Sequence, residues 1–151
     1  MRALIFIVAG KELFSRKLPK IVTMKLRFEK NSLRYRLRKS DVEQLTHTGL
    51  VKESVAFPSS TFTFELHVSD NVIDPTAEFI NNSVIVNIPV GIATEWINTD
   101  EVGVFHLMHI NESETLDILI EKDFPCKDHP EEDKSDTFTE LAEKVGKNEV
   151  C

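Results

Sequence analysis

Two pairs of residues have the spacing of metal ligands. Cys126 and His129 form a Cys-x-x-His arrangement, and a thiolate and an imidazole at this spacing can chelate zinc from one loop. A structural zinc site needs four ligands, however, and only the remote Cys151 adds another thiol. His106 and His109 are three residues apart, which places them on opposite faces of a strand. We therefore predict no cofactor and no metal centre, with a Cys126/His129 metal site as the less favoured alternative.

A second group of residues could bind an anion. Arg34 and Arg36 alternate along one strand-like segment, and Arg27 precedes them. A guanidinium group offers the forked donors that recognise phosphate. Acids that could face these arginines, or hold a divalent cation beside them, lie on other predicted strands: Glu65, Asp117 and Glu121. The alternative, which we favour, is a solvated or salt-bridged face, because exposed charge on the outer face of a strand is common.

The C-terminal segment is acidic and differs from the rest of the chain. It contains the run Glu131-Glu132-Asp133, followed by Asp136. The stretch Thr137-Phe138-Thr139-Glu140 has the form of a capping box, which predicts a short C-terminal helix. We expect the tail to be extended first and helical near its end.

The first 23 residues also stand apart. Ala3 to Ala9 are apolar, but this run is far too short to span a bilayer. The segment carries five basic residues and one acid, and Met24 opens a clean strand pattern, so Met24 is an alternative start of the protein. We divide the chain into an N-terminal extension (1–23), a folded domain (24–123) and an acidic tail (124–151).

Composition limits the classes of function. The chain has 151 residues, of which 41% are apolar, and a formal net charge of −7. Nucleic acids and anionic membranes attract basic proteins, so we predict neither as a partner. Two cysteines do not make a disulfide framework, which favours a cytoplasmic location. No catalytic signature or glycine-rich loop is present, so we lean against an enzyme without excluding one.

Hydrophobic periodicity predicts two similar series of elements. Ser40 to Glu43 form a capping box at the start of a short helix, and Gly49 ends it. The strand predicted over 102–110 is apolar on both faces and is therefore expected to be central. The strands are predicted over 25–28, 32–37, 51–57, 61–68, 77–80, 83–88, 102–110 and 115–121, with a second helix over 90–97.

The two series align when the first is shifted by 51 residues. Phe28 then falls on Phe79, and Leu45 falls on Trp96, without a gap through the helix. We predict an α+β domain made of two ββαββ repeats. The repeats are expected to form one antiparallel sheet or an open β-barrel, with two short helices and a short C-terminal helix.

Three segments together resemble a family of small bacterial proteins known only as a domain of unknown function. They are MKLRFEKNSLRYRLRKSDVEQL (24–45), EWINTDEVGV (95–104) and LDILIEKDFPCKDHPEEDKSDTF (116–138). The resemblance covers roughly residues 24–138 and supports Met24 as the start. It implies no activity. It marks four positions of the tail as residues to test: Cys126, Glu132, Asp133 and Asp136.

Two hypotheses about function remain open. The first is a non-catalytic binding or accessory protein that uses a sheet face or the acidic tail against a protein partner. The second is a barrel that binds an anion or processes a phosphate ester. Geometry distinguishes them, because the second requires the arginines and the acids to point into one concave cavity.

Overall fold

The computed structural model describes residues 24–125 and 134–142. Eight strands, two α-helices and one 3₁₀ turn follow one another in these residues: β1 (Lys25–Glu29), β2 (Ser32–Leu37), α1 (Lys39–Thr48), β3 (Leu50–Ala56), β4 (Thr61–Ser69), β5 (Thr76–Ile80), β6 (Ser83–Pro89), α2 (Val90–Asn98), β7 (Gly103–His109), β8 (Thr115–Lys122) and η1 (Thr139–Leu141). The C-terminal helix is thus a 3₁₀ turn in its described part. The candidates Cys126, His129, Glu132 and Asp133 lie outside the described residues.

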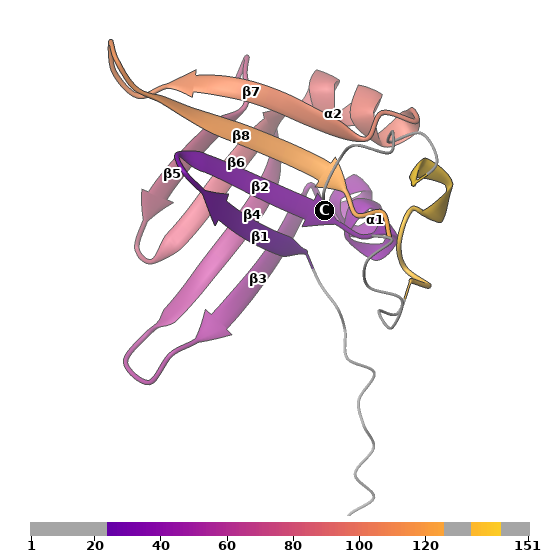
Figure 1. The fold of residues 1–151 in the computed structure, drawn as a ribbon, viewed down its shortest axis with the longest axis horizontal. Coiled ribbons are helices and arrows are strands. Elements are labelled where there is room, and N and C mark those ends of the chain that lie inside the picture. The colour runs from indigo at the N-terminus through magenta and orange to yellow at the C-terminus, as the bar shows by residue number, and fades with distance from the viewer. Residues whose placement is uncertain (1–23, 126–133, 143–151) are drawn as a thin grey trace, which may run out of the picture.

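The strands form two four-stranded sheets (Figure 1). The first has the order β1-β2-β8-β7 and the second the order β3-β4-β6-β5. The central pairs β2–β8 and β4–β6 are parallel, and the outer pairs are antiparallel. The prediction of one antiparallel sheet or an open barrel is therefore wrong, whereas the α+β class and the two short helices are confirmed. Periodicity specifies each hairpin locally, but it does not specify which hairpins pair.

Each sheet combines one hairpin from the first half of the chain with one from the second half. The connection between hairpins differs little between the halves: α1 leads from β2 to β3, and α2 leads from β6 to β7. A matching contact ties each short turn to the neighbouring hairpin. The Asn31 carbonyl accepts the Asp117 N–H at 3.0 Å, and the Asn82 carbonyl accepts the Thr63 N–H at 3.0 Å. Asn31 and Asn82 are 51 residues apart, so the predicted shift also relates these turns.

The hydrophobic core lies between the inner faces of the two sheets and continues under the helices. Alternate residues of the central strands supply it, as period-two side-chain placement requires, and α1 and α2 add Leu45 and Trp96. Strand β7 lies at a sheet edge, so the prediction that it is central is wrong. Its apolar outer residues Phe105 and Leu107 are exposed instead.

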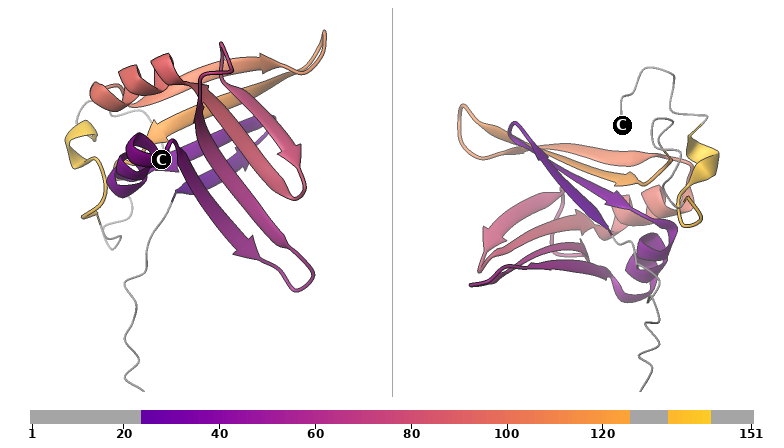
Figure 2. Two further views of the ribbon diagram at one scale, coloured as in Figure 1. Left: turned by 180° about the vertical axis from the view of Figure 1, so that it is seen from behind. Right: turned by 60° about the horizontal axis from the view of Figure 1, so that its bottom comes forward.

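The domain has two unlike ends (Figure 2). At the closed end, α1, α2 and residues 134–142 cover the core. At the open end, the four hairpin turns (30–31, 57–60, 81–82 and 110–114) project and the sheets diverge. Asn81 and Asn82 both have positive φ, of 49° and 61°, as a tight two-residue hairpin turn requires. Neither α-helix of the described chain is long and apolar enough to cross a membrane.

Candidate functional site

An apolar pocket of about 350 Å³ lies between the two sheets at the open end. Both sheets line it with inward-facing apolar side chains. Glu78 also borders the pocket, but its position opposite Ile85 places its side chain on the outer face of the second sheet. The lining residues are Phe28, Leu33, Phe62, Ala77, Glu78, Phe79, Val84 and Leu116. An apolar concavity of this size is suited to holding an aliphatic or aromatic group.

Two phenylalanines at the pocket are incompletely covered. Phe28 is 58% exposed and Phe79 is 70% exposed. They lie on β1 and β5, beside the short turns of the two halves. Their neighbours across the strand pairs, Leu33 and Val84, are buried. The pocket therefore has a buried floor and an aromatic rim, and apolar rims of this kind mark interaction sites.

Our sequence analysis did not identify this pocket. The signal was present, because Phe28 and Phe79 occupy equivalent positions of the two halves, but we used these residues only to align the repeats. A strand pattern shows which face is apolar and does not show how far two sheets diverge. Where the hydrophobic core ends and the pocket begins therefore depends on how the two sheets are arranged.

The predicted arginine stripe lies on the outer face of the first sheet. Arg34 and Arg36 alternate with the buried side chains of β2, and Glu121 of β8 is 3.2 Å from Arg36 Nε and 3.6 Å from Arg34 Nε. Arg27 instead pairs with Glu29 at 3.0 Å. Arg36 is only 14% exposed at its side chain, and its guanidinium also lies over the Phe124 ring at 5.2 Å. The two central arginines therefore share one carboxylate.

Asp117 lies near Arg34, whereas Glu65 lies apart from both arginines. Asp117 lines a second pocket, of about 180 Å³, together with Arg27 and Arg34. Glu65 lies on the second sheet, on the face turned away from the core. The structure thus brings Arg27, Arg34, Arg36, Asp117 and Glu121 to one face, and it does not bring Glu65 to them.

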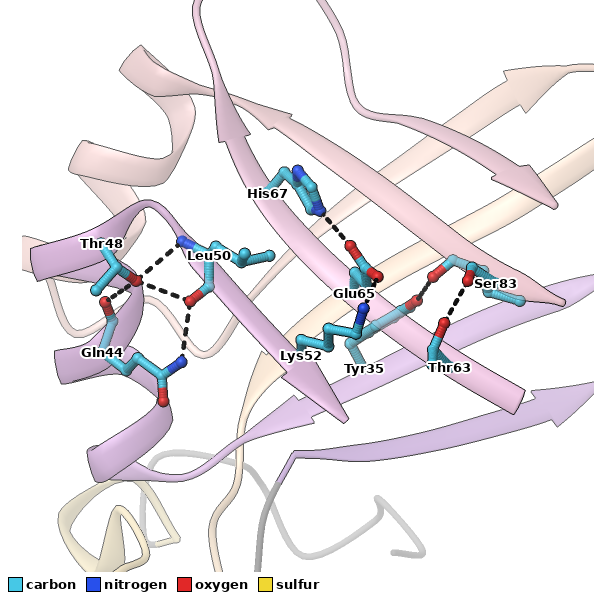
Figure 3. A network of polar contacts seen from close by, with 10 residues as sticks. Tyr35, Gln44, Thr48, Leu50, Lys52, Thr63, Glu65, His67 and Ser83 are labelled. Atoms are coloured by element: carbon cyan, nitrogen blue, oxygen red, sulfur yellow. Dashed lines mark hydrogen bonds and ion pairs between the residues drawn. The ribbon is translucent and has the colours of Figure 1, made fainter. Parts of the chain in front are cut away.

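Glu65 belongs to a small polar network of its own (Figure 3). Its carboxylate contacts Lys52 Nζ at 2.9 Å and His67 Nε2 at 2.8 Å. Hydrogen bonds from Lys52 and His67 hold the pKa of Glu65 below its usual value.

Tyr35 crosses the core from the other sheet and donates its hydroxyl to the Val84 carbonyl at 3.3 Å. Burial raises the pKa of Tyr35 well above its usual value, so Tyr35 is a neutral donor.

Charged groups at the closed end are buried. Asp123 lies 3.2 Å from Lys25 Nζ and 3.9 Å from Arg38 Nε. The side chains of Asp123 and Arg38 are only 4% and 6% exposed. Within residues 24–125 and 134–142, Arg38 Nε and Asp123 Oδ2 have no hydrogen-bond partner. The same aspartate bonds through its backbone to Leu37 and Phe138. Asp123 therefore joins β1, β2 and residues 134–142 at one point.

Lys122 caps the second helix from inside the domain. Its ammonium group donates to the carbonyl oxygens of Trp96 at 2.9 Å and Thr99 at 2.5 Å. These carbonyls belong to the C-terminal end of α2, where the helix dipole favours a cation. The Trp96 and Phe138 rings lie 5.7 Å from the ammonium nitrogen. Burial lowers the pKa of Lys122.

The start of α1 is capped differently from our prediction. The helix begins at Lys39, and the Asp41 carboxylate accepts the Arg38 N–H at 2.8 Å. Asp136 of the tail accepts the Ser40 N–H at 3.0 Å and also bonds the Ser40 hydroxyl. The capping box that we predicted at Ser40–Glu43 is therefore wrong: the N-cap is Arg38, its N–H bonds the local Asp41, and the Ser40 N–H bonds Asp136 of the tail. Gly49 ends the helix with a φ of 71°, as predicted.

Asp41 and Asp136 are the two carboxylates that accept backbone N–H groups at the start of α1. Burial raises the pKa of Asp41 to about 6, and Arg38 partly offsets the increase by hydrogen bonding. Asp136, one of the tail positions marked for testing, lies at the helix N-terminus, where carboxylates stabilise a helix. Among the described residues, no group of three or more histidines, cysteines and acids could hold a metal ion.

The fold and pocket define a two-sheet α+β domain with an apolar pocket at one end of its core. The chain belongs to a family of unknown function, DUF7009, whose model matches residues 24–141. The match confirms the resemblance to a domain of unknown function. No curated protein and no solved structure is significantly similar to the chain.

Proposed function

We propose that this protein is a non-catalytic binding domain whose pocket between the two sheets receives an apolar group of a partner molecule. The pocket at the open end is the observation that carries this proposal. Its volume of about 350 Å³ lies within the range of ligand-binding pockets, roughly 300–1,000 Å³. The exposed rings of Phe28 and Phe79 would gain contacts when the pocket is filled.

The contacts of the arginines favour this function over anion binding. Arg34 and Arg36 share Glu121, so a phosphate would have to compete with a carboxylate that is already in place. Glu65 lies on the other sheet and could not hold a cation beside that phosphate. The charged face therefore fits the salt-bridged interpretation, in which Arg36, Glu121 and Phe124 pack together.

Binding of an apolar fluorescent dye, anilinonaphthalene sulfonate, tests the proposal. The folded full chain is expected to bind the dye saturably. Ala77→Trp and Leu116→Trp each place an indole in the pocket from a different sheet and should abolish that binding. Phe105→Ser removes an exposed ring from the outer face of the first sheet and serves as the matched control. Unchanged dye binding in both filled variants, with their folding confirmed by circular dichroism, would reject the proposal.

We also infer that the two halves arose from one duplicated ββαββ unit. Their common element order and the equivalent contacts of Asn31 and Asn82 support this origin. A cytoplasmic location stays a prediction from the sequence. Measuring the distribution of the tagged full chain between cell fractions would test that location.

A further inference from the structure

Strand β7 is an edge strand of the first sheet and differs from the other edge strands in having no charged residue. No strand of the described chain pairs with it on the side away from β8 (Figure 1). Each of the other three edge strands contains charged side chains: Lys25, Arg27 and Glu29 in β1, Lys52 and Glu53 in β3, and Glu78 in β5. Charged side chains commonly protect an edge strand from pairing with another chain. Strand β7 lacks this protection.

The backbone of β7 directs the hydrogen-bonding groups of every second residue toward the free edge. The Lys122 N–H donates to the Val102 carbonyl at 2.8 Å, and the Ile110 N–H donates to the Glu114 carbonyl at 2.9 Å. Hydrogen-bonded and non-hydrogen-bonded residue pairs alternate along an antiparallel ladder, so the even-numbered residues of β7 bond to β8. The backbone groups that face the free edge belong to Gly103, Phe105, Leu107 and His109.

The side chains of two of these residues form an exposed apolar strip on the outer face of the sheet. Phe105 is 59% exposed and Leu107 is 48% exposed. Leu119 of β8 lies opposite Phe105 in the ladder and extends the strip by one strand. The free edge therefore combines unused backbone hydrogen-bonding positions with apolar side chains, which are the two features that an added strand would cover.

We propose that β7 pairs with β7 of a second copy of this chain, in antiparallel orientation about a twofold axis at His106. In this register the outward N–H and C=O groups of Phe105 bond to those of Leu107 of the second copy, and the reciprocal pair forms on the other side of the axis. The Phe105 ring also lies across from the Leu107 side chain, and Val104 lies across from Met108 on the inner face. This surface is separate from the pocket, so the pairing does not depend on the proposed binding function.

The distribution of charge favours a second copy at β7 and disfavours one at the other edges. The same twofold pairing of β1, β3 or β5 about its middle residue would place Arg27, Glu53 or Glu78 opposite its own copy. Like charges directly opposite each other destabilise a strand pair. The middle residue of β7 is His106, and an ordinary imidazole is neutral at about pH 8. Strand β7 is thus the edge strand of the described chain that can pair with itself without charge repulsion at the axis.

Sedimentation equilibrium of the full chain, at about pH 8 and with a reductant, tests the proposal. A single strand pair is a smaller contact than a standard interface of about 1,600 Å², so we expect a dissociation constant of about 10 µM. Leu107→Lys places a charge at the free edge and should weaken dimerisation at least about tenfold. Val55→Lys replaces an exposed apolar residue of another edge strand, β3, and should leave the dissociation constant unchanged. Circular dichroism confirms that both variants are folded.

A cysteine at the twofold axis tests the register of the pairing. In a Cys126→Ser and Cys151→Ser background, His106→Cys would place two thiols in a non-hydrogen-bonded antiparallel pair, whose Cα atoms lie about 4.5 Å apart. A disulfide spans Cα separations of about 4.4–6.8 Å, so mild oxidation should give a covalent dimer. Glu78→Cys in the same background places an exposed thiol at the middle of edge strand β5. This control should stay largely monomeric.

Three results would overturn the pairing of β7. The first is a chain that stays monomeric up to about 0.5 mM, well above the expected dissociation constant. The second is a dimer that Leu107→Lys leaves as tight as the parent, because its contact would then lie elsewhere. The third is cross-linking of His106→Cys that does not exceed that of Glu78→Cys. The dye experiment addresses the pocket alone, so its failure would reject the proposed function and leave this inference standing.

Discussion

The closed end of the domain buries charged side chains, whereas the open end leaves large apolar side chains exposed. Arg38, Lys122 and Asp123 are almost completely inaccessible at the closed end, and Phe28 and Phe79 are exposed at the open end. Burying a charge is costly unless it is paired, and exposing a large ring forgoes hydrophobic stabilisation. The difference indicates that the closed end fixes the arrangement of strands and helices, and that the open end is suited to contact another molecule.

The largest expected effect on stability lies at the closed end, at Asp123. Asp123→Asn removes the carboxylate charge that faces Arg38 and Lys25 and should lower the free energy of unfolding by about 3–5 kcal/mol, because a buried charge is left uncompensated. Urea denaturation gives this value. The control Glu140→Gln breaks an exposed pair with Lys39 and should cost less than about 1 kcal/mol. Equal losses of unfolding free energy in the two variants would show that the buried charges around Asp123 contribute no more to stability than an exposed ion pair does.

Lys122 is the next position in order of expected effect. Lys122→Met keeps the aliphatic length but leaves the Trp96 and Thr99 carbonyls without their donor, so a loss of about 2–3 kcal/mol is expected. Lys39→Met is the matched control, since Lys39 is exposed. Thermal unfolding at neutral pH measures both changes. A Lys122→Met protein as stable as the parent would contradict the capping role.

The raised pKa of Asp41, at the closed end, predicts that the free energy of unfolding depends on pH. With its pKa raised from 3.8 to about 6, the folded protein binds more protons than the unfolded chain between about pH 4 and 6. The contribution of Asp41 to the free energy of unfolding therefore falls as pH rises through this interval, by roughly 1–3 kcal/mol. Asp41→Asn keeps the acceptor for the Arg38 N–H and should remove this component. Parallel pH profiles for the parent and the variant would refute the assignment.

The smallest expected effects on stability come from the rim of the pocket. Phe28→Ala and Phe79→Ala should each change the free energy of unfolding by less than about 1 kcal/mol, because surface side chains contribute little. Binding of the apolar dye should nevertheless weaken in both. Urea denaturation and dye titration on the same samples give the two values. A large loss of stability in either variant would assign the rings to the core and remove the contrast between the ends.

Local structure followed from the sequence more completely than the sheet arrangement did. Period-two alternation gave the strands of both hairpins in each half, and Gly49 gave the end of α1. The pairing of β2 with β8 and of β4 with β6 depends on contacts 85 and 20 residues apart, which no local pattern encodes. The start of α1 was misplaced partly for the same reason, because the acceptor for the Ser40 N–H comes from the distant Asp136, although the acceptor for the Arg38 N–H is the local Asp41.

The candidate site illustrates the same limit. The arginine stripe could be recognised from residue types, and its salt bridges with Glu121 agree with the favoured interpretation of that face. We grouped Glu65 with the arginines because alternation assigns a residue to one face of a strand but does not show which strands share a sheet. The pocket required knowledge of both sheets at once. Phe28 and Phe79 could have drawn attention as paired aromatic residues next to turns, but their exposure depends on where the sheets diverge.

Mapping the contact of an apolar compound by NMR tests the central claim most directly. The dye is titrated into ¹⁵N-labelled full chain, and amide shifts are followed residue by residue. The contrast between the ends predicts saturable shifts at the ends of β1 and β5, the start of β8 and the adjoining turns, with little change in α1, α2 and residues 134–142. Shifts concentrated at the closed end or around Phe105, or the absence of any saturable shift, would contradict it.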